Sequence, residues 1–417
     1  MSAEIICVGT ELLLGDILNT NVQFLAKELA SLGIPHFYQT VVGDNFTRLQ
    51  NVIKIASQRA SILVFTGGLG PTPDDLTTET IAQVFETPLV EHPEIIRDIS
   101  QKLAAQGRTM ADNNRKQALL PKGAGILPNP SGTAPGLLWQ PRPNLTLITF
   151  PGVPSEMKRM WRETAVSYLK SQGWGKEIIY SRMLYFRGIR ESDLSAKLAH
   201  FFELSNPTVA PYTSLGEVRL RISAKTRSKT EAIALIEPIT QKIKKIAGLD
   251  YYGSDDDTLA LVVGNLLRQA GETASVAESC TGGGLGAMFT TVPGSSDYFI
   301  GGIIAYKNQV KIDLLGVNSK DLEQSGAVSE VVAQQMSLGV KKRLGTSWGI
   351  SITGIAGPGE GTEIKPVGLV YVGLADNQGR VESFKCQFGA IHDRDTIRFL
   401  SSYAALDRLR RRLLLNN

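Results

Sequence analysis

The stretch Ile62-Leu63-Val64-Phe65-Thr66-Gly67-Gly68-Leu69-Gly70 decides the fold class of the first part of the chain. Its first five residues are all apolar or β-branched, which predicts a short strand buried on both faces, as in a parallel sheet. The glycines that follow allow backbone N–H groups to approach a ligand at the end of that strand, where open α/β sheets bind their ligands. This stretch therefore predicts an α/β domain with a phosphate site at Gly67, Gly68 and Gly70.

Strand and helix patterns alternate on both sides of this stretch. Strands are expected where short runs are rich in β-formers, and helices where apolar residues recur every three to four positions. The expected elements are strands at Glu4–Val8, Phe37–Val42 and Leu145–Phe150 and helices at Val22–Leu32, Leu49–Ala56, Leu76–Phe85 and Glu156–Leu169. Residues 1–172 are thus predicted to form one three-layer α/β domain.

Two further domains are expected. In residues 173–253, β-rich runs flank helices, and a polar segment at Tyr251–Thr258 is expected to be a flexible linker. Residues 254–417 alternate again, with strands expected at Thr273–Ala277, Phe299–Ala305 and Trp348–Thr353. The predicted fold class is α/β, with two three-layer α/β domains separated by a small α+β domain.

The composition is that of an ordinary globular protein. Lys and Arg number 44 and Asp and Glu number 40, so that the net charge of +4 is too small to argue for a nucleic-acid partner. The basic run Arg408 to Arg412 is expected to be the solvated face of a C-terminal helix. No apolar run is long enough for a membrane helix, and three scattered cysteines indicate neither disulfides nor a zinc site. We therefore expect a cytoplasmic protein without a membrane or nucleic-acid partner.

Acidic residues surround the glycine loop. Asp74, Asp75 and Glu79 lie at the start of the following helix, where carboxylates could hold Mg²⁺ and bridge it to a phosphate. The same pattern also fits a tight turn that leads into a capped helix. Glu11 and Asp16 follow the first strand. If the first and third strands are neighbours, their two loops would face one cleft.

A second candidate site lies in Glu278-Ser279-Cys280-Thr281-Gly282-Gly283-Gly284, directly after an expected strand. At such a strand-to-helix turn the Ser279 hydroxyl is exposed as a nucleophile, and backbone N–H groups beside it form an oxyanion hole. His392 is the only histidine of this domain. We expect Lys311 to act as the base instead, because burial lowers the pKa of a lysine.

Other interpretations of these residues are open. Lys311 also fits the surface of a helix, and Ser279 fits an N-cap. Cys280 fits either a second nucleophile or a buried structural thiol.

Two more segments favour a pocket in the same domain. Thr353 and Gly354 end another expected strand in a glycine-rich loop. Arg394 and Arg398 lie one turn apart and could grip a phosphate, although Asp395 and Arg398 equally fit a surface ion pair.

The N-terminal motifs resemble those of a known fold. The segments Thr66–Gly70, with Asp75, and Pro151–Pro154 resemble the molybdopterin-binding fold of molybdenum-cofactor biosynthesis proteins, with Leu69 in place of a common threonine. Val8–Asp16 has the form seen at the start of the CinA (competence- and damage-inducible) family. The resemblance implies hydrolysis of a dinucleotide pyrophosphate such as ADP-ribose with a divalent metal. It places Asp75, Asp74 and Glu11 near the metal and the phosphates.

The C-terminal domain resembles that of the CinA family in Ala277–Gly283, Ala327–Glu330, Thr353–Pro358 and Lys365–Gly368. The resemblance implies a nicotinamide-nucleotide amidase, which converts nicotinamide mononucleotide (NMN) and water to nicotinate mononucleotide and ammonia without a cofactor. It implies that Ser279 attacks the carboxamide and that Lys311 relays its proton to the leaving ammonia. The other implied roles are oxyanion stabilisation near Thr281, Gly282 and Gly283, shaping of the site by Tyr306 and Thr353, and phosphate binding by Arg394 or Arg398.

The middle domain of this family is similar to a KH module, which normally grips nucleic acid with a Gly-x-x-Gly loop. Residues 175–250 contain no such loop, so that we expect a spacer or dimer element and a homodimeric protein. The whole chain is expected to be a pyridine-nucleotide salvage enzyme that acts on NMN and ADP-ribose. Rival hypotheses are a molybdopterin-binding protein and a non-catalytic competence or DNA-damage adaptor.

Overall fold

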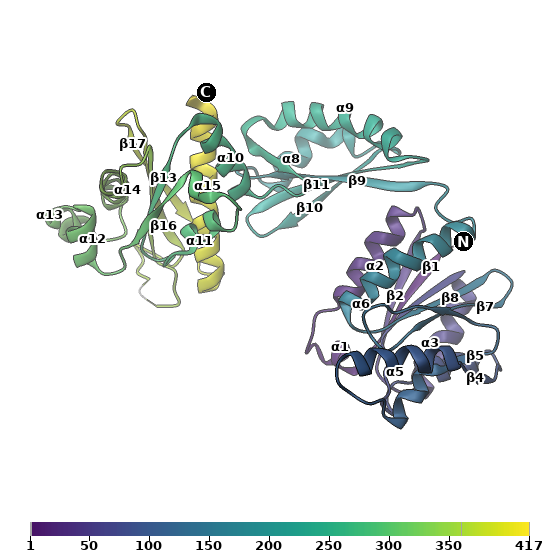
Figure 1. Cartoon of the computed structure of the whole chain (residues 1–417). Helices are drawn as coiled ribbons and strands as arrows, with labels where there is room; N and C mark the ends of the chain where they lie inside the picture. The colour runs from purple at the N-terminus through teal and green to yellow at the C-terminus, as the bar shows by residue number, and fades with distance from the viewer. Residues whose placement is uncertain (1, 360, 417) are drawn as a thin grey trace. The chain divides into compact units, whose positions relative to one another are not determined.

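The computed structural model describes residues 2–359 and 361–416, which form mixed α/β architecture (Figure 1). The chain divides into two compact units, one of Met1–Ser181 and Ser223–Ile236 and the other of Arg182–Ile222 and Glu237–Asn417. Each unit has its own buried apolar clusters. None of the described helices combines the length and apolar character needed to cross a bilayer.

The first sheet contains the strand that precedes the glycine loop. Its order is β2-β1-β3-β8-β7-β6, and the first four strands are parallel. The strands are β1 (Ala3–Val8), β2 (His36–Val42), β3 (Ile62–Thr66), β6 (Gly125–Leu127), β7 (Gly136–Arg142) and β8 (Leu145–Phe150). Because β1 and β3 are direct neighbours, the loops that follow them leave the same edge of the sheet.

Helices cover both faces of this sheet, as the alternation of side chains requires. Ile5 and Cys7 pack against α2 (Thr20–Ser31) and α6 (Pro154–Met160), whereas Ile6 and Val8 pack on the opposite side. The helices on that opposite side are α3 (Phe46–Arg59), α4 (Thr77–Val84) and α5 (Pro93–Ala105). Figure 1 labels α3 and α5 on this side of the sheet. The predicted three-layer architecture is confirmed for this domain.

Some N-terminal elements were not predicted. They are α1 (Thr10–Leu14), α5, β4 (Leu89–Glu91), β5 (Leu119–Pro121), β6 and β7. Most of them have three to seven residues, which is too short for an apolar period to stand out in the sequence. One of these elements, α1, lies directly after β1, in a segment that was expected to be a loop.

The middle sheet has the order β10-β11-β9-β12. Its elements are β9 (Ile178–Phe186), α8 (Glu191–Leu198), β10 (Thr208–Ser214), β11 (Glu217–Thr226), α9 (Lys229–Ala247) and β12 (Tyr251–Ser254). The expectation of a flexible linker at Tyr251–Thr258 was wrong for its first half, because Tyr251–Ser254 pairs with β9 as an antiparallel strand. Tyr252 is buried in the core, and the acidic residues that suggested a linker follow the strand.

The C-terminal sheet has the order β14-β13-β15-β16-β17. Its strands are β13 (Ala274–Glu278), β14 (Phe299–Ile304), β15 (Trp348–Gly354), β16 (Leu369–Ala375) and β17 (Val381–Gln387). The central strand β13 is parallel to both of its neighbours, whereas β16 and β17 are antiparallel. The carboxyl ends of β13, β14 and β15 therefore meet at one edge of the sheet, where ligands bind in such folds.

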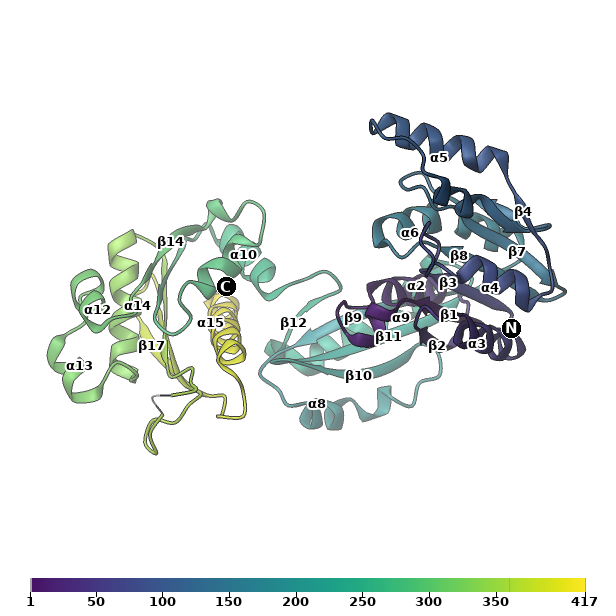
Figure 2. The ribbon, with the colours of Figure 1, turned by 90° about the horizontal axis from the view of Figure 1, so that it is seen from below.

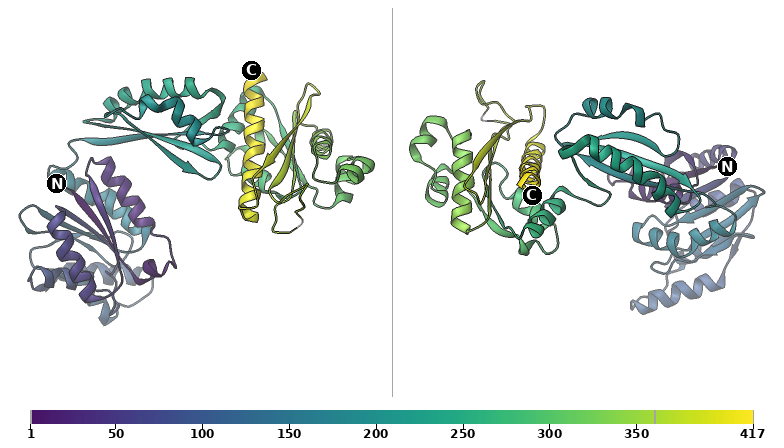
Figure 3. Two further views of the ribbon diagram at one scale, coloured as in Figure 1. Left: turned by 180° about the vertical axis from the view of Figure 1, so that it is seen from behind. Right: turned by 90° about the horizontal axis from the view of Figure 1, so that it is seen from above.

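Helices also cover both faces of the C-terminal sheet (Figures 2 and 3). One face packs against α10 (Leu259–Ala270), α11 (Gly284–Thr290) and α15 (Arg394–Asn416). The other packs against α12 (Asn308–Leu315), α13 (Ser319–Ser325) and α14 (Glu330–Leu344). This domain is also a three-layer α/β structure, as predicted.

Candidate functional site

Ser279 is the first residue after the central strand β13. Its backbone N–H donates to the Ile352 carbonyl of β15 at 2.9 Å. On the other side, the Ala305 N–H after β14 donates to the Glu278 carbonyl at 2.7 Å. Both neighbouring strands thus fix the backbone at the point where the hydroxyl leaves the sheet. Ser279 is partly exposed, so that a ligand can reach it.

Lys311 lies in the first half of α12 and extends its side chain back to Ser279. Its Nζ atom is 3.2 Å from the Ser279 Oγ atom, 2.8 Å from the Ala305 carbonyl oxygen and 3.0 Å from the Tyr306 carbonyl oxygen. Only 1% of the residue is exposed, which rules out a surface helix lysine. Burial lowers the pKa of Lys311 from 10.5 to about 8. A fraction of the molecules therefore has an uncharged Lys311 amine near pH 7.

A cavity of about 800 Å³ opens at this edge of the sheet. Its described lining residues include Ser279, Lys311, Tyr306, Thr353, Gly354 and Arg394, all of which the sequence predicted. Lys307 and Lys365 also line it, and none of the described lining residues is acidic. The cavity therefore favours an anionic group, and its volume is in the range of small-molecule sites.

The glycine turn after Ser279 is held by a buried carboxylate that the sequence analysis did not assign. Glu278 accepts hydrogen bonds from the N–H groups of Gly283 and Leu285 at 3.0 Å each and of Gly286 at 2.8 Å. A carboxylate at a helix start satisfies the free N–H groups there and is stabilised by the helix dipole. An acidic residue just before a glycine-rich helix start was the available sequence signal.

This arrangement changes the interpretation of the expected oxyanion donors. The Gly283 N–H is bound to Glu278, and the Gly282 N–H donates to the Ser279 carbonyl at 3.1 Å. Thr281, Gly282 and Gly283 are not among the described residues that line the cavity. The N–H groups of Gly282 and Gly283 are thus used inside the turn, contrary to expectation. Those of Cys280 and Thr281 have no recorded acceptor within the described chain.

Two alternative interpretations of this turn were wrong. Ser279 is not an N-cap, because α11 begins at Gly284 and its first N–H groups are bound by Glu278. Cys280 is 6% exposed, and burial raises its pKa to about 12. A thiol with that pKa carries almost no thiolate at neutral pH, so that Cys280 is not a competent nucleophile.

The two arginines of α15 have different surroundings. Arg394 lines the cavity and donates to the Gly357 carbonyl at 2.6 Å and to the Tyr306 hydroxyl at 3.1 Å. Arg398 instead donates to the Thr281 carbonyl at 3.1 Å and forms the surface ion pair with Asp395 at 3.0 Å. Arg394 is therefore the arginine placed to meet a ligand.

The N-terminal glycine loop is tied down through its carbonyl groups. Thr77 donates its hydroxyl to the Gly67 carbonyl at 2.8 Å and its N–H to the Gly68 carbonyl at 3.1 Å. Gln117 donates to the Leu69 carbonyl at 3.3 Å. No acceptor in the described chain is recorded for the N–H groups of Gly68, Leu69 and Gly70. These N–H groups suit an anion, whereas the Gly67 N–H is bound to the Phe150 carbonyl.

The acidic residues expected at a metal do not converge. Glu11 lines a cavity of about 80 Å³ beside Thr66 and Gly152, whereas Asp75 lines a separate one of about 10 Å³ beside Gly68 and Gly70. Asp75 accepts hydrogen bonds from the N–H and hydroxyl groups of Thr72, and Asp74 is exposed. Among the described residues, no group of three His, Cys, Asp or Glu side chains could hold a metal ion. The donor set does not fit a divalent ion in this arrangement.

Models of three protein families match successive parts of the chain. They are the probable molybdopterin binding domain at residues 4–171, the damage-inducible protein CinA KH domain at residues 181–253 and the CinA C-terminal domain at residues 256–413. A CinA-like protein of Rippkaea orientalis is 78% identical over 414 residues, which cover 99% of this chain and 100% of the relative. A CinA-like protein of Crocosphaera subtropica is 73% identical with the same coverage.

Solved structures are similar over a part of the chain. The competence/damage inducible protein CihA from Agrobacterium tumefaciens is 37% identical, covers 38% of this chain and 94% of its own, and has a TM-score of 0.36. A CinA protein of unknown function from Thermoplasma acidophilum is 30% identical, covers 40% of this chain and 96% of its own, and has a TM-score of 0.38.

Proposed function

Because the chain belongs to the CinA family, we propose that its C-terminal domain is a nicotinamide-nucleotide amidase, which converts NMN and water to nicotinate mononucleotide and ammonia. The observation that carries this proposal is the buried amine of Lys311 at 3.2 Å from the Ser279 hydroxyl. A serine with a base in hydrogen-bond reach is the arrangement needed for attack on an amide carbon. The experiment that tests it is the simultaneous measurement of ammonia and nicotinate mononucleotide from NMN.

The surroundings of Lys311 orient its lone pair. An ammonium group has three N–H donors, and three acceptors surround this one: the carbonyl oxygens of Ala305 and Tyr306 and the Ser279 hydroxyl. When the amine loses a proton, the two carbonyls can each accept one of the two remaining hydrogens. The lone pair then faces the Ser279 hydroxyl, which is the position required of a general base.

The proposed reaction has two halves. In the first, the Ser279 Oγ atom bonds to the carboxamide carbon and its proton moves to the Lys311 Nζ atom. Lys311 then gives this proton to the leaving amide nitrogen, so that the C–N bond breaks and ammonia leaves an ester on Ser279. In the second half, water attacks the ester and loses a proton to Lys311, which returns it to the Ser279 oxygen as the acid is released.

The substrate phosphate is proposed to bind at Arg394. This side chain lines the cavity, and its contacts with the Gly357 carbonyl and the Tyr306 hydroxyl fix its position. Lys365 also lines the cavity but already donates to the Ser325 carbonyl. A guanidinium group suits the bidentate recognition of a phosphate.

The pH dependence of the amidase follows from Lys311. Its amine must be neutral to accept a proton, and its pKa is about 8. The kcat/KM for NMN should therefore rise about tenfold per pH unit between pH 6.5 and 7.5 and level off above about pH 8.5. Initial rates of ammonia release at constant ionic strength check this profile. A rate that does not change between pH 6.5 and 9 would exclude the amine as the base.

A second activity is proposed for the N-terminal domain: hydrolysis of ADP-ribose with a divalent metal. The observation that favours it is the set of N–H groups at Gly68, Leu69 and Gly70, which suit a phosphate. The acidic side chains do not form a metal site in the described arrangement, and Asp75 would first have to leave Thr72. The requirement for a metal is therefore tested separately from the hydrolysis of ADP-ribose itself.

AMP formation from ADP-ribose tests this second activity. With Mg²⁺ present, Asp75→Ala should lower the rate at least about tenfold, and chelation of the metal should remove it. The matched control is Asp98→Ala, which removes an exposed carboxylate of α5 that pairs with Lys102 and lines neither of the two small cavities. If the parent keeps its full rate in the presence of a chelator, or if Asp75→Ala keeps the full rate with Mg²⁺, the metal proposal fails.

We also propose that the protein is cytoplasmic, forms a homodimer and acts in pyridine-nucleotide salvage. The rivals differ in what they bind. A molybdopterin-binding protein would bind pterin and release no ammonia from NMN. A non-catalytic adaptor would bind DNA in a salt-sensitive manner, for which the net charge of +4 offers little support.

A further inference from the structure

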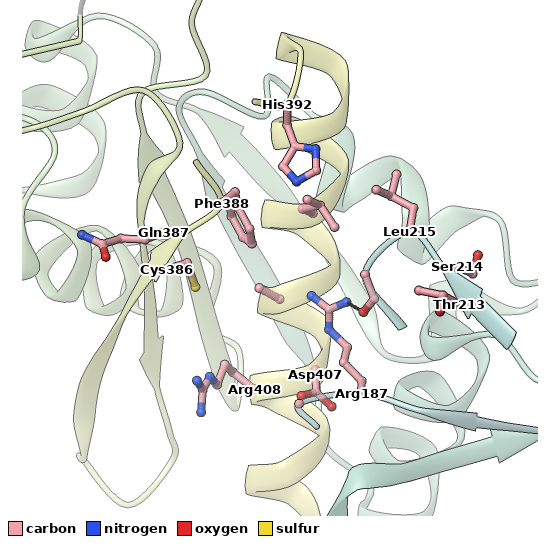
Figure 4. Close-up of a pocket in the computed structure, with 14 residues that line it drawn as sticks. Arg187, Thr213, Ser214, Leu215, Cys386, Gln387, Phe388, His392, Asp407 and Arg408 are labelled. Carbon is pink, nitrogen blue, oxygen red and sulfur yellow. Dashed lines mark hydrogen bonds between the residues drawn. The ribbon is translucent and has the colours of Figure 1, made fainter. Parts of the chain in front are cut away.

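A second large cavity lies in the Arg182–Ile222 and Glu237–Asn417 unit, away from Ser279. Its volume is about 770 Å³, and it shares no lining residue with the cavity at Ser279. Figure 4 shows it beside α15, with the turn between β10 and β11 on one side and the end of β17 on the other. Leu215, Phe388 and Leu400 supply apolar walls. Its size is that of a small-molecule site, and none of the proposed reactions uses it.

Buried hydrogen bonds hold the walls of this cavity together. Arg410 is 1% exposed and donates to the carbonyl groups of Leu249 at 2.6 Å and Tyr251 at 3.0 Å. Arg411 donates to the Arg187 carbonyl at 2.5 Å and to the Asp250 carboxylate at 2.8 Å. The expectation that Arg408 to Arg412 form a solvated face was therefore wrong, because the chain before α10 packs onto this helix. These hydrogen bonds attach Arg187 and the segment 249–251 to α15, the helix beside which the cavity lies.

Arg187 is a buried cation in the cavity wall. Only 8% of the residue is exposed, and burial lowers its pKa. Its guanidinium donates to the Gly216 carbonyl and lies 5.0 Å from the centre of the Tyr403 ring. Arg187 forms no direct ion pair among the described residues, and the charge of Asp407 offsets only part of the effect of burial on its pKa. A buried arginine usually has a carboxylate or phosphate partner, because the loss of hydration is otherwise uncompensated.

The one acidic side chain among the described lining residues is already engaged. Asp407 forms ion pairs with Arg410 at 2.7 Å and with Arg411 at 2.8 Å. Besides Arg187, the other ionisable groups of the lining are His392, Cys386, whose pKa burial raises, and Arg408, whose guanidinium lies 4.4 Å from the centre of the Phe384 ring. Figure 4 shows Asp407 near Arg187, and His392 at the far end of the cavity. The cavity thus has more positive than negative charge. Neither Arg187 nor Arg408 forms an ion pair within the described residues, and Arg187 is the more deeply buried of the two.

From these contacts we infer that the cavity binds a small anion with an apolar body, such as an aromatic or branched aliphatic carboxylate, sulfonate or phosphate. The acid group pairs with Arg187 and supplies the missing counter-charge. The apolar body packs against Phe388 and Leu400, which line the same cavity. A neutral molecule of the same shape binds more weakly, because it leaves the guanidinium unpaired.

The test uses two fluorescent probes of similar shape with the full-length protein. The first is 8-anilinonaphthalene-1-sulfonate, an aromatic sulfonate, and the second is N-phenyl-1-naphthylamine, which lacks the acid group. We expect Arg187→Met to raise the Kd of the sulfonate at least about tenfold and to change that of the neutral probe less than about twofold. Arg343→Met removes an exposed arginine of α14 and should leave both constants unchanged.

Two further variants separate binding from folding. Arg187→Lys keeps the positive charge and should bind the sulfonate more tightly than Arg187→Met does, whereas Ala404→Phe fills the cavity and should lower the affinity of both probes. Circular dichroism and the Tm identify any variant that has not folded. If the folded Arg187→Met protein binds the sulfonate as tightly as the parent, or if the parent does not prefer the sulfonate to the neutral probe, the inference is overturned.

Discussion

Ser279→Ala is expected to lower ammonia release from NMN by at least about 10⁴-fold, the size of effect seen when a catalytic serine is removed. The substitution deletes the atom proposed to attack the carboxamide, while Lys311 still bonds to the carbonyls of Ala305 and Tyr306. NMN binding should be retained, since Arg394 and the cavity walls are unchanged. Coupled detection of ammonia and isothermal titration with NMN measure the two quantities.

The matched control for this variant is Ser319→Ala. Ser319 is exposed in the first turn of α13 and does not line the cavity. Its rate should stay within about twofold of the parent, as expected of a surface substitution. Full activity in Ser279→Ala would show that the serine is not the nucleophile, and a parent protein without activity would favour the rival functions.

Lys311→Met is expected to lower the same rate by about 10³-fold. The methionine keeps much of the side-chain length but has no amine to accept the Ser279 proton or return it to the leaving nitrogen. The carbonyls of Ala305 and Tyr306 lose a donor, which costs stability, but the burial of a charged amine is also removed. The Tm therefore has to be measured together with kcat.

Two variants distinguish a proton carrier from a merely structural cation. Lys311→Arg keeps the charge but cannot lose it near neutral pH, so that its activity should be as low as that of Lys311→Met. Lys311→Ala opens a space in which added ethylamine should restore part of the rate, more strongly at higher pH. Lys320→Met, an exposed lysine of α13, is the matched control. High activity in Lys311→Arg would contradict the role of the amine as a base.

Much of the fold was predictable because local patterns reflect burial. β3 is apolar or β-branched along its length because both faces of the strand are covered, and the glycines after it follow from the tight turn into α4. Tyr251–Ser254 was misjudged because its partner β9 lies far back in the chain, and the acidic residues next to it dominated the local pattern. Elements of three residues carry no period and could not be predicted.

The candidate site was predictable in part. Ser279, Thr353 and Arg394 could be proposed because glycine-rich strand ends and helix starts are visible in the sequence. Glu278 was not identified, although it binds the Gly283 N–H group, which was expected to contribute to an oxyanion hole. A metal was also expected at Glu11, Asp74 and Asp75, but Glu11 and Asp75 line separate cavities and Asp74 is exposed. Side-chain direction depends on neighbours that no local pattern contains.

The order of residues along the chain was sufficient to establish the α/β class, the strand ends at which the glycine turns lie, and the family, because strand periods and glycine turns are local properties. The protonation of Lys311, the engagement of Glu278 with the helix start and the burial of Arg187 depend on packing between distant segments. The free energy of a charge is set by the water it loses and the partners it gains. Only the folded chain decides both.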